Sequence, residues 1–341
     1  MKRAHDLRRA VFASITLLGL LALLSSAWAG NAGERVKIGF IKASFCGPVF
    51  LAREKGYFAQ EGIEPDLVFF GAGQGVPVAI VSGDIEFGVV GPTAAFYSLA
   101  AQNDLRIIGG NHREVPGFQS QVIALSNRAY AAGLKTYRDF AGHSFVTSTL
   151  GSPSHYTLAL LMAKYGVDLK TVQVLALQSI PNAVSAIVGG QADTTILPVT
   201  ALFPSIQAEK VRPLGWVGDE TPFQLGVIVT KRKTADAKPA LVNRFLRALR
   251  KGAKAYHDAY ADARDHRRDG PDAAEVTAII AANVGQSPEQ VARGISYIDA
   301  NLRIDAKDIR RQVDWFHAQG MVKGTVDVDA LIDKRYAVAL P

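Results

Sequence analysis

Cysteine is almost absent from this chain of 341 residues, in which Cys46 stands alone. A single thiol excludes an internal disulfide, so burial of apolar surface must hold the fold together. The apolar share of 48% is that of an ordinary globular protein. Beyond the N-terminal leader described below, roughly 310 residues remain, which is enough for two domains with sizeable cores.

The common catalytic motifs are also absent. The chain contains no Gly-x-Ser-x-Gly, His-Glu-x-x-His or Gly-Lys-Ser/Thr sequence. Gly71, Gly73 and Gly75 open a helix after a strand, but they lack the third-glycine spacing of a dinucleotide site and follow the second strand. We interpret this segment as a turn that holds a small ligand. We therefore expect no catalytic residue, no cofactor and no metal site.

No basic stripe with interleaved aromatics is present. Removing the leader's four positive charges and Asp6 lowers the formal net charge from +7 to about +4. The remaining basic residues are scattered, and one amphipathic helix carries Arg247, Arg250, Lys251 and Lys254. The solvent-exposed face of this helix accounts for its four basic residues, so we expect no nucleic-acid partner.

The N-terminal segment has the pattern of a secretory signal. Four positive charges, on Lys2, Arg3, Arg8 and Arg9, precede an apolar run from Val11 to Leu24. Ala27 and Ala29 then place small residues at the positions that a signal peptidase accepts. The run is shorter than the roughly 20 residues that a transmembrane helix needs. We expect residues 1–29 to be removed after Ala29 and the mature protein to reside in the periplasm.

A long internal repeat is the most informative feature. Ala79–Glu86 (AIVSGDIE) is echoed by Ala186–Asp193 (AIVGGQAD). The offset from Ala79 to Ala186 is also the offset from Val36–Phe40 to His143–Thr147, a second pair of similar segments. This shared offset is about twice the longest period of solenoid repeats, which is roughly 50 residues. We therefore predict two lobes of similar fold.

Strands alternate with helices within each lobe. In the first lobe we expect strands over 36–41, 65–70 and 85–90, and helices over 48–60 and 76–82. The second repeats this with strands over 143–148, 172–177 and 194–197, and helices over 154–164 and 183–188. This order predicts an α/β protein of two similar three-layer αβα lobes, each with a parallel sheet. Ligands bind beyond the carboxyl ends of such strands, so the lobes would share one cleft.

Several segments resemble one family of binding proteins. Pro48–Ile63 (PVFLAREKGYFAQEGI), with Gly39 before it and Ser82–Gly88 (SGDIEFG) after it, is similar to the sulfonate, taurine, nitrate and thiamine-precursor binding proteins of ABC importers. Leu134–Gly142 (LKTYRDFAG) and Gly190–Asp193 extend the resemblance over most of residues 36–260.

The resemblance implies a type II periplasmic-binding fold with a two-strand hinge, its crossovers near residues 121–125 and 225–230. The first lobe (lobe 1) would comprise residues 30–120 and 226–341, including the C-terminal helices, and the second (lobe 2) would comprise residues 121–225. The chain would act as a monomer that hands a small-molecule ligand to an ABC transporter permease and its ATPase subunit. In the family pattern, an acidic residue and an alanine precede an apolar strand. Here Asp193 is followed by Thr194 and Thr195, so the chain departs from that pattern.

The leading ligand is a small organic anion, such as the aliphatic sulfonate taurine or a related carboxylate. The alternatives are an aromatic acid or a pyrimidine thiamine precursor, for which Phe45, Tyr97, Phe118 and Trp216 would supply stacking walls. A thiamine-pyrimidine-synthase-like enzyme shares the Gly-Tyr-Phe neighbourhood. One cysteine and an export signal argue against that enzyme, whose family carries a cysteine-rich segment.

Polar residues at helix starts are the candidate ligand contacts of lobe 1. The loop of Ser44, Phe45 and Cys46 leaves the first strand, with Phe45 as a wall and Cys46 as either a contact or a small buried apolar residue. Gln74 and Thr93 lie at helix N-termini, where free amides and the positive dipole end favour an anion. Plain N-capping is the alternative for Thr93.

Lobe 2 offers a hydroxyl-rich loop opposite. We predict that the anion lies between Thr93 and residues 152–155, with His155 as a donor unless it is a solvated surface residue. The region from Asn111, His112 and Arg113 to Gly117 precedes the first crossover. A cationic side chain there could contact the ligand or serve the hinge, and we interpret the region as part of the hinge. The candidate contacts of lobe 2 are Ser148, Ser152, Ser154, His155, Asn182 and Pro198.

Overall fold

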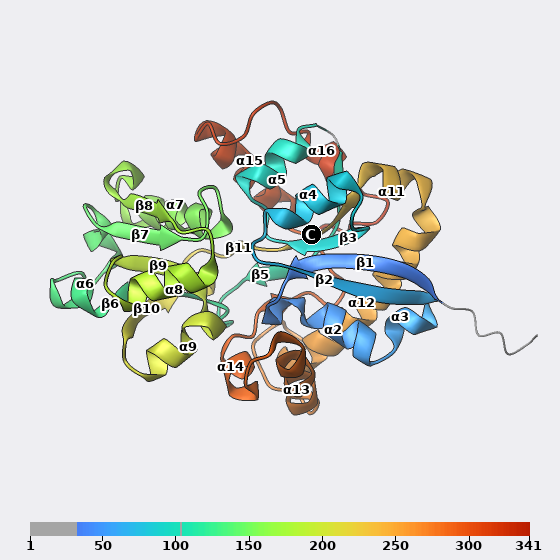
Figure 1. The fold of residues 1–341 in the computed structure, drawn as a ribbon, viewed down its shortest axis with the longest axis horizontal. Helices are drawn as coiled ribbons and strands as arrows, with labels where there is room; N and C mark the ends of the chain where they lie inside the picture. Colours follow the sequence, from blue (N-terminus) through green and yellow to red (C-terminus); the bar gives the residue numbers. More distant parts are fainter. Residues whose placement is uncertain (1–32, 103) are drawn as a thin grey trace, which may run out of the picture. The chain divides into compact units, whose positions relative to one another are not determined.

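Two five-stranded sheets and one three-stranded sheet organise this protein (Figure 1). The computed structural model describes residues 33–102 and 104–341. The predicted signal peptide, residues 1–29, lies outside the described residues. Residues 35–341 form one compact unit, and the lobe boundaries within it remain a prediction.

The first sheet has the strand order β2-β1-β3-β12-β4. β1 and β3 are parallel, whereas β12 runs antiparallel to both β3 and β4. The expectation of a purely parallel sheet is therefore wrong, because a strand that follows the second sheet in the chain is inserted here. The strands are β1 (Glu34–Ile41), β2 (Ile63–Phe70), β3 (Phe87–Val90), β4 (Leu105–Gly110) and β12 (Val227–Lys231).

The second sheet repeats this plan in the order β10-β6-β9-β7-β8. β7 is parallel to β8 and β9, and β6 runs antiparallel to β9 and β10. Its strands are β6 (Gln121–Ser126), β7 (Ser144–Thr147), β8 (Gln173–Ala176), β9 (Thr194–Pro198) and β10 (Val211–Trp216). The repeat predicted from the sequence thus extends to strand order, and the predicted α/β class is confirmed.

Helices cover both faces of the first sheet (Figure 1). One face carries α4 (Gly75–Ser82) and α5 (Ala94–Ala100), and the other carries α2 (Gly47–Glu54), α3 (Tyr57–Gln60) and α12 (Pro239–Tyr260). α12 places apolar residues at helical spacing, and its Phe245 stacks on Phe87 of β3 with ring centroids 3.9 Å apart. Burying each such ring contributes about 1.5 to 3 kcal/mol.

The expected helix over residues 48–60 is two helices. Gly56 has φ +71°, in the left-handed region that glycine occupies without steric cost, and it separates α2 from α3. The periodic apolar pattern continues across this break, so the pattern alone did not reveal it. Because a left-handed residue cannot continue a right-handed helix, α2 ends at Glu54.

The second sheet is covered in the same manner. α7 (Pro153–Tyr165) packs Leu158 and Leu161 in the apolar cluster that contains Ile196 of β9. α8 (Ile180–Val188) and α9 (Val199–Gln207) contribute Ala183, Ile187 and Leu202 to a separate cluster with Val146 of β7. These separate clusters give the sheet the two covered faces predicted from the repeat.

A small antiparallel sheet, here called the crossover sheet, lies where the chain passes between the two large sheets. Its order is β11-β5-β13, formed by β5 (His112–Glu114), β11 (Phe223–Gln224) and β13 (Tyr297–Ile298). Crossovers were expected near residues 121–125 and 225–230, but residues 121–125 lie in β6 and residues 227–230 lie in β12, both within the large sheets. The connecting segments therefore precede them, and a third strand from the C-terminal region joins them.

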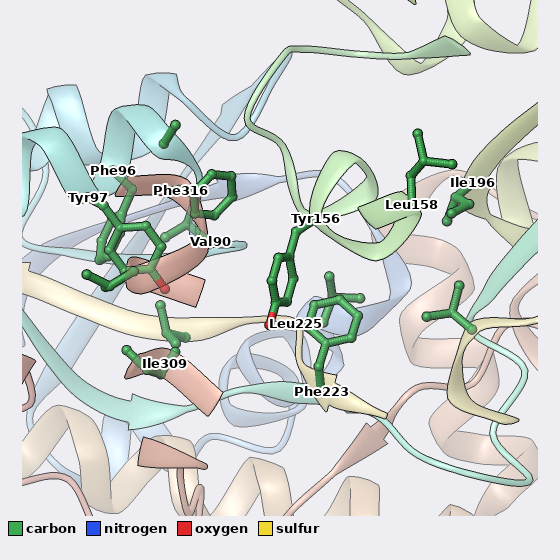
Figure 2. Close-up of a cluster of buried hydrophobic side chains, with 14 of the residues drawn as sticks. Val90, Phe96, Tyr97, Tyr156, Leu158, Ile196, Phe223, Leu225, Ile309 and Phe316 are labelled. Carbon is green, nitrogen blue, oxygen red and sulfur yellow. The ribbon is translucent and has the colours of Figure 1, made fainter. Parts of the chain in front are cut away.

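The C-terminal region adds further helices, and one of them, α15 (Ala306–Ala318), contacts elements of both halves of the chain. Phe316 of α15 lies 5.7 Å from Tyr97 of α5 and 6.0 Å from Tyr156 of α7, measured between ring centroids (Figure 2). Tyr156 also packs edge-on against Phe223 of β11. One apolar cluster therefore joins α5, α7, α15 and the crossover sheet.

The remaining elements are short or peripheral. Within the described ranges, no helix combines the length and the hydropathy needed to cross a membrane. The C-terminal helices are α13 (Ala273–Val284), α14 (Pro288–Arg293), α15 (Ala306–Ala318) and α16 (Val328–Leu331). The others are α6 (Asn127–Ala131), α10 (Val217–Glu220), α11 (Arg232–Ala237), η2 (Ser44–Cys46), η3 (Tyr137–Phe140) and η4 (Leu169–Thr171).

Candidate binding site

The loops that follow β3 and β7 contact each other directly. The backbone N–H of Ala94, in the first turn of α5, donates to the carbonyl oxygen of Gly151 at 2.9 Å. Both residues follow the carboxyl end of a parallel strand, where α/β proteins place their ligands. The structure thus brings together the two segments, near Thr93 and near Ser152, between which the sequence analysis placed the anion.

The hydroxyls of these two segments cap their own helices. Thr93 is the N-cap of α5, and its Oγ1 accepts from the N–H of Phe96 at 3.0 Å. Ser152 is the N-cap of α7, and its Oγ accepts from the N–H of His155 at 3.3 Å and lies 2.9 Å from Oγ1 of Thr147. Capping uses a lone pair, so the Thr93 hydroxyl can still donate its proton to a further acceptor. The role of either hydroxyl in ligand binding remains a prediction.

Glycine makes this close approach possible. Gly151 has φ +69°, and a Cβ there would lie 2.6 Å from the Cβ of Ala94. At Gly91, which directly follows β3, a Cβ would lie 3.0 Å from Cγ of Pro153. Side chains at these positions would push the β3 and β7 loops apart.

A second contact joins the β1 and β9 loops through the C-terminal region. Ser44 Oγ donates to the carbonyl oxygen of Gly294 at 3.4 Å, and Gln290 Nε2 donates to the carbonyl oxygen of Thr200 at 3.3 Å. A Cβ at Gly294 would lie 2.4 Å from Cγ2 of Thr200. Gln290 and Gly294 lie outside the internal repeat and outside the segments that resemble the binding-protein family, so neither could be predicted as part of this contact.

In the loop of residues 44–46, which follows β1, Phe45 makes an aromatic contact and Cys46 is part of the buried core. Phe45 stacks on His112 with ring centroids 4.2 Å apart and an interplanar angle of 11°. Cys46 is fully buried, and its Sγ donates to the carbonyl oxygen of Ile41 at 3.6 Å. Burial raises the pKa of this thiol well above its usual value, so it stays protonated. These features favour the small buried apolar role for Cys46.

His155 is not a solvated surface residue, since it is 5% exposed. Its Nδ1 accepts from the N–H of Gly151 at 3.2 Å, which leaves the ring proton on Nε2. The ring packs edge-on against Trp315 of α15 at 5.4 Å. Burial lowers the pKa of His155, so the side chain offers a neutral donor and not a positive charge.

The other candidates are dispersed along the strand ends. Gln74 is the N-cap position of α4 without a capping bond, and Pro198 is the last residue of β9. Ser148 accepts from the N–H of Gln178 through its carbonyl oxygen at 2.7 Å, and Ser154 is half-buried in α7. Asn182 is exposed in the first turn of α8, a helix that begins at Ile180 and not, as expected, at Ala183.

Two of the proposed aromatic walls are core residues. Tyr97 is fully buried and its hydroxyl donates to Oε1 of Gln312 at 3.1 Å, and Phe118 packs on Tyr297 of the crossover sheet. Neither ring presents a free face to a ligand. The expectation that Tyr97 and Phe118 line the site is therefore wrong.

Polar groups are buried in the crossover sheet. Arg113 lies 3.6 Å from Asp305, so its charge is paired. Glu114 is fully buried; its Oε1 accepts from the hydroxyl of Ser120, whereas its Oε2 has no partner among the described residues. Burial raises the pKa of Glu114 to about 8. Among the described residues, no three His, Cys, Asp or Glu side chains are grouped to hold a metal ion.

Comparison with known proteins gives one family match. The family model described as "NMT1/THI5 like" matches residues 45–263. A protein of Brucella abortus (strain 2308) named as a binding protein is 30% identical over 189 residues, which cover 55% of this chain and 54% of that protein. The chain thus spans about half the length of the curated relatives it matches.

Solved structures share the fold at low sequence identity. The alkanesulfonate-binding protein SsuA from Xanthomonas axonopodis pv. citri, bound to MOPS, is similar with a TM-score of 0.69 and 22% identity, over 89% of this chain and 99% of that chain. The aliphatic sulphonate binding protein SsuA from Escherichia coli has a TM-score of 0.70 and 20% identity, over 90% and 94%. The nitrate-binding protein NrtA from Synechocystis has a TM-score of 0.67 and 13% identity, over 89% and 86%. These likenesses identify the fold as that of periplasmic binding proteins.

Proposed function

Because the chain belongs to the NMT1/THI5-like family, we propose that it is the solute-binding component of an ABC-type importer in the periplasm. In this proposal its two lobes, built on the first and second sheets, close over a small organic anion. An aliphatic sulfonate such as taurine, or a related carboxylate, is the leading ligand. The loaded protein would then deliver the ligand to a permease and its ATPase subunit.

One observation carries the proposal. The hydrogen bond from Ala94 N–H to Gly151 O joins the loops that follow β3 and β7, which stand at the carboxyl ends of strands in the two sheets. When loops at the strand ends of two sheets lie this close together, a small molecule bound beside them can contact residues of both sheets. That arrangement suits capture and release of a small molecule, with contacts from both halves.

The donors near this contact favour an oxyanion. Thr93 and Ser152 provide hydroxyls at helix N-termini, and His155 provides a neutral ring N–H. Free amides and the positive end of the helix dipole add to these donors at the start of the 13-residue α7. Such a set binds negative charge by hydrogen bonds without requiring a cationic side chain.

Binding would proceed by a shift between open and closed forms. Contacts that a ligand makes to both lobes exist only when the lobes are closed, so the ligand stabilises the closed form by its differential affinity. The chain passes twice between the two large sheets, and each passage contributes a strand, β5 or β11, to the crossover sheet. This sheet would serve as the hinge. No bond is made or broken in this cycle.

A thermal-shift screen tests the proposal. The mature protein is heated with taurine, ethanesulfonate, MOPS, nitrate, benzoate and a 4-aminopyrimidine thiamine precursor. A ligand present at about 100 times its dissociation constant stabilises the folded state by about 2.7 kcal/mol, so the melting temperature rises. Stabilisation by a sulfonate or carboxylate supports the proposal. Stabilisation by the pyrimidine alone would replace the anion with the alternative ligand, and no stabilisation by any compound would contradict a binding role for this set.

A further inference from the structure

His112 lies at the start of the crossover sheet, and its imidazole is held firmly in place. The residue is 2% exposed, and its ring stacks on Phe45. The ring also lies against Gly226, where a Cβ would come within 2.2 Å of the His112 Nδ1 atom. The glycine therefore gives the ring its space, and the stacking fixes the plane of the ring.

Asn111 determines which ring nitrogen carries the proton. Its side-chain Nδ2 lies 3.1 Å from the carbonyl oxygen of Phe45 and 2.9 Å from the Nδ1 atom of His112. A carbonyl oxygen only accepts, so this Asn111 atom is the amide nitrogen, and His112 Nδ1 must accept from it. The ring proton is then on Nε2. Burial lowers the pKa of His112 to about 3, so the imidazole is neutral near pH 7.

The orientation of the Asn111 amide lowers the stability of the fold, and no contact of its oxygen atom with the described residues compensates for this loss. Asn111 Oδ1 is buried without a hydrogen-bond partner in the described part of the chain, and leaving a buried acceptor unsatisfied destabilises the folded state. Within the described part of the chain, the one hydrogen bond of the His112 ring is at Nδ1, so the Nε2–H has no protein acceptor there. An unsatisfied group that orients a donor is expected at a functional site.

The place of His112 in the fold fits contact with a ligand. It follows β4, whose carboxyl end lies at the same edge of the first sheet as that of β3, since both strands run antiparallel to β12. The loop of Phe45 leaves β1 at that edge as well. Arg113, its neighbour, is paired with Asp305 and supplies no free charge.

We propose that His112 contacts the ligand, donating from Nε2 to an acceptor oxygen or nitrogen that lies beside the Phe45 ring, and that Asn111 is the residue that positions it. This inference rests on the proposed binding function. The ligand then carries an acceptor atom that the Nε2–H of His112 can reach. The donor is neutral, so it selects for an acceptor and not for a full negative charge.

Ring-nitrogen NMR of the ¹⁵N-labelled mature protein tests the tautomer without any ligand. We expect His112 at pH 7 to show a protonated Nε2 and an unprotonated Nδ1, and Asn111→Ala to abolish this preference. A proton on Nδ1, or an imidazolium, would overturn the inference. This measurement does not depend on whether the ligand has been found.

The second test uses the compound from the thermal-shift panel that stabilises the protein most. His112→Phe keeps a ring on Phe45 and loses both nitrogens, whereas His112→Gln keeps an amide donor near the position of Nε2. By calorimetry we expect about a tenfold or greater loss of affinity for His112→Phe and a smaller loss for His112→Gln. His266→Gln, at an exposed loop residue, is the control and should leave the affinity unchanged.

The outcomes separate the two proposals. A panel without a binder counts against the proposed function. A binder whose affinity is the same for His112→Phe and the parent protein overturns the His112 contact while the proposed function stands. A perturbed Nε2 signal on addition of that binder, together with the loss of affinity, supports the contact.

Discussion

Glu86 and Asp193 perform the same structural task at equivalent positions of the internal repeat. Glu86 Oε2 accepts from the N–H of Lys37 at 2.8 Å, and Asp193 Oδ2 accepts from the N–H of Ser144 at 2.9 Å. Each carboxylate stands just before the strand, β3 or β9, that pairs with the strand of its donor, and the two donors are separated by the same offset as the two acceptors. The internal repeat is thus preserved in individual hydrogen bonds.

Asp193→Asn should destabilise the protein more than Glu86→Gln. Asp193 also accepts from Ser144 Oγ and pairs with Arg128 at 2.8 Å. Burial alone would raise the pKa of Asp193, but hydrogen bonds from Ser144 and His143 and the charge of Arg128 lower it overall. We expect a loss of about 1 to 3 kcal/mol in the free energy of unfolding at pH 7.

The sign of the pH dependence follows from that lowered pKa. A carboxylate with a lowered folded-state pKa stabilises the fold above its unfolded pKa of about 4, and loses this contribution as the pH falls through the folded value. The difference between the parent and Asp193→Asn in urea unfolding should therefore shrink below pH 4. A difference that is constant from pH 7 to pH 3 would contradict this account.

Glu114→Gln should make stability less dependent on pH. The folded-state pKa of about 8 lies above the unfolded value, so the stability contribution of Glu114 is complete below about pH 4.5 and is lost as the pH rises toward 8. This one group then lowers the free energy of unfolding by about 1.4 kcal/mol per pH unit between those values. Denaturant titrations from pH 5 to 8 should show a flatter profile for Glu114→Gln. Glu64→Gln, at an exposed position, should keep the parent slope, and identical slopes in all three proteins would refute the buried-carboxyl account.

Gly294→Ala should hold the molecule open. A Cβ at this position would lie 2.4 Å from Thr200 Cγ2 and 2.9 Å from Val199 Cγ1, so the contact between α14 and α9 could not form as it stands. Small-angle scattering with a saturating ligand should give a larger radius of gyration for the variant than for the parent, and ligand affinity should fall. At Gly71 a Cβ would meet nothing within 4 Å, so Gly71→Ala is the matched control for the radius of gyration alone. Equal radii in all three proteins would show that this contact does not govern closure.

Thr93→Ala separates capping from ligand binding. The loss of an N-cap costs about 1 kcal/mol of stability. Ser126 makes an equivalent cap on α6, accepting from the N–H of Ala129 at 3.2 Å. Both alanine variants should therefore lower the melting temperature by similar amounts, whereas Thr93→Ala alone should weaken ligand binding, by about ten- to a hundredfold. If Thr93→Ala binds the ligand as tightly as the parent protein, Thr93 acts only as the N-cap of α5 and does not contact the ligand.

Local patterns in the sequence predicted most of the elements but not how distant segments pair. Apolar runs and the shared offset of the repeat located β1, β3, β7 and β9 within a few residues. The antiparallel placement of β12 was not visible, because Val227 pairs with Val90 across the whole second sheet in the chain order. Nothing near Val227 in the sequence specifies that partner.

The same limit applies to the candidate site. Thr93 and Ser152 could be singled out because N-caps precede helices in recognisable patterns, and both are N-caps in the structure. Gly294 could not, since its contact with Ser44 joins positions that are far apart in the chain. The position of His112 before the first crossover indicated only a hinge role. Its tautomer depends on Asn111 and Phe45, whose arrangement exists only after the first sheet has formed.

The carbonyl of Gly151 has a consequence for the energetics of capture. It occupies the amide of Ala94, which is the kind of donor that an incoming oxyanion would use at this helix end. The protein therefore contains its own competitor, an internal acceptor that a ligand at this amide must displace. Affinity at that amide would then report a difference between two acceptors, and replacing the carbonyl contact by one with an anion exchanges a neutral hydrogen bond for a charge-assisted one.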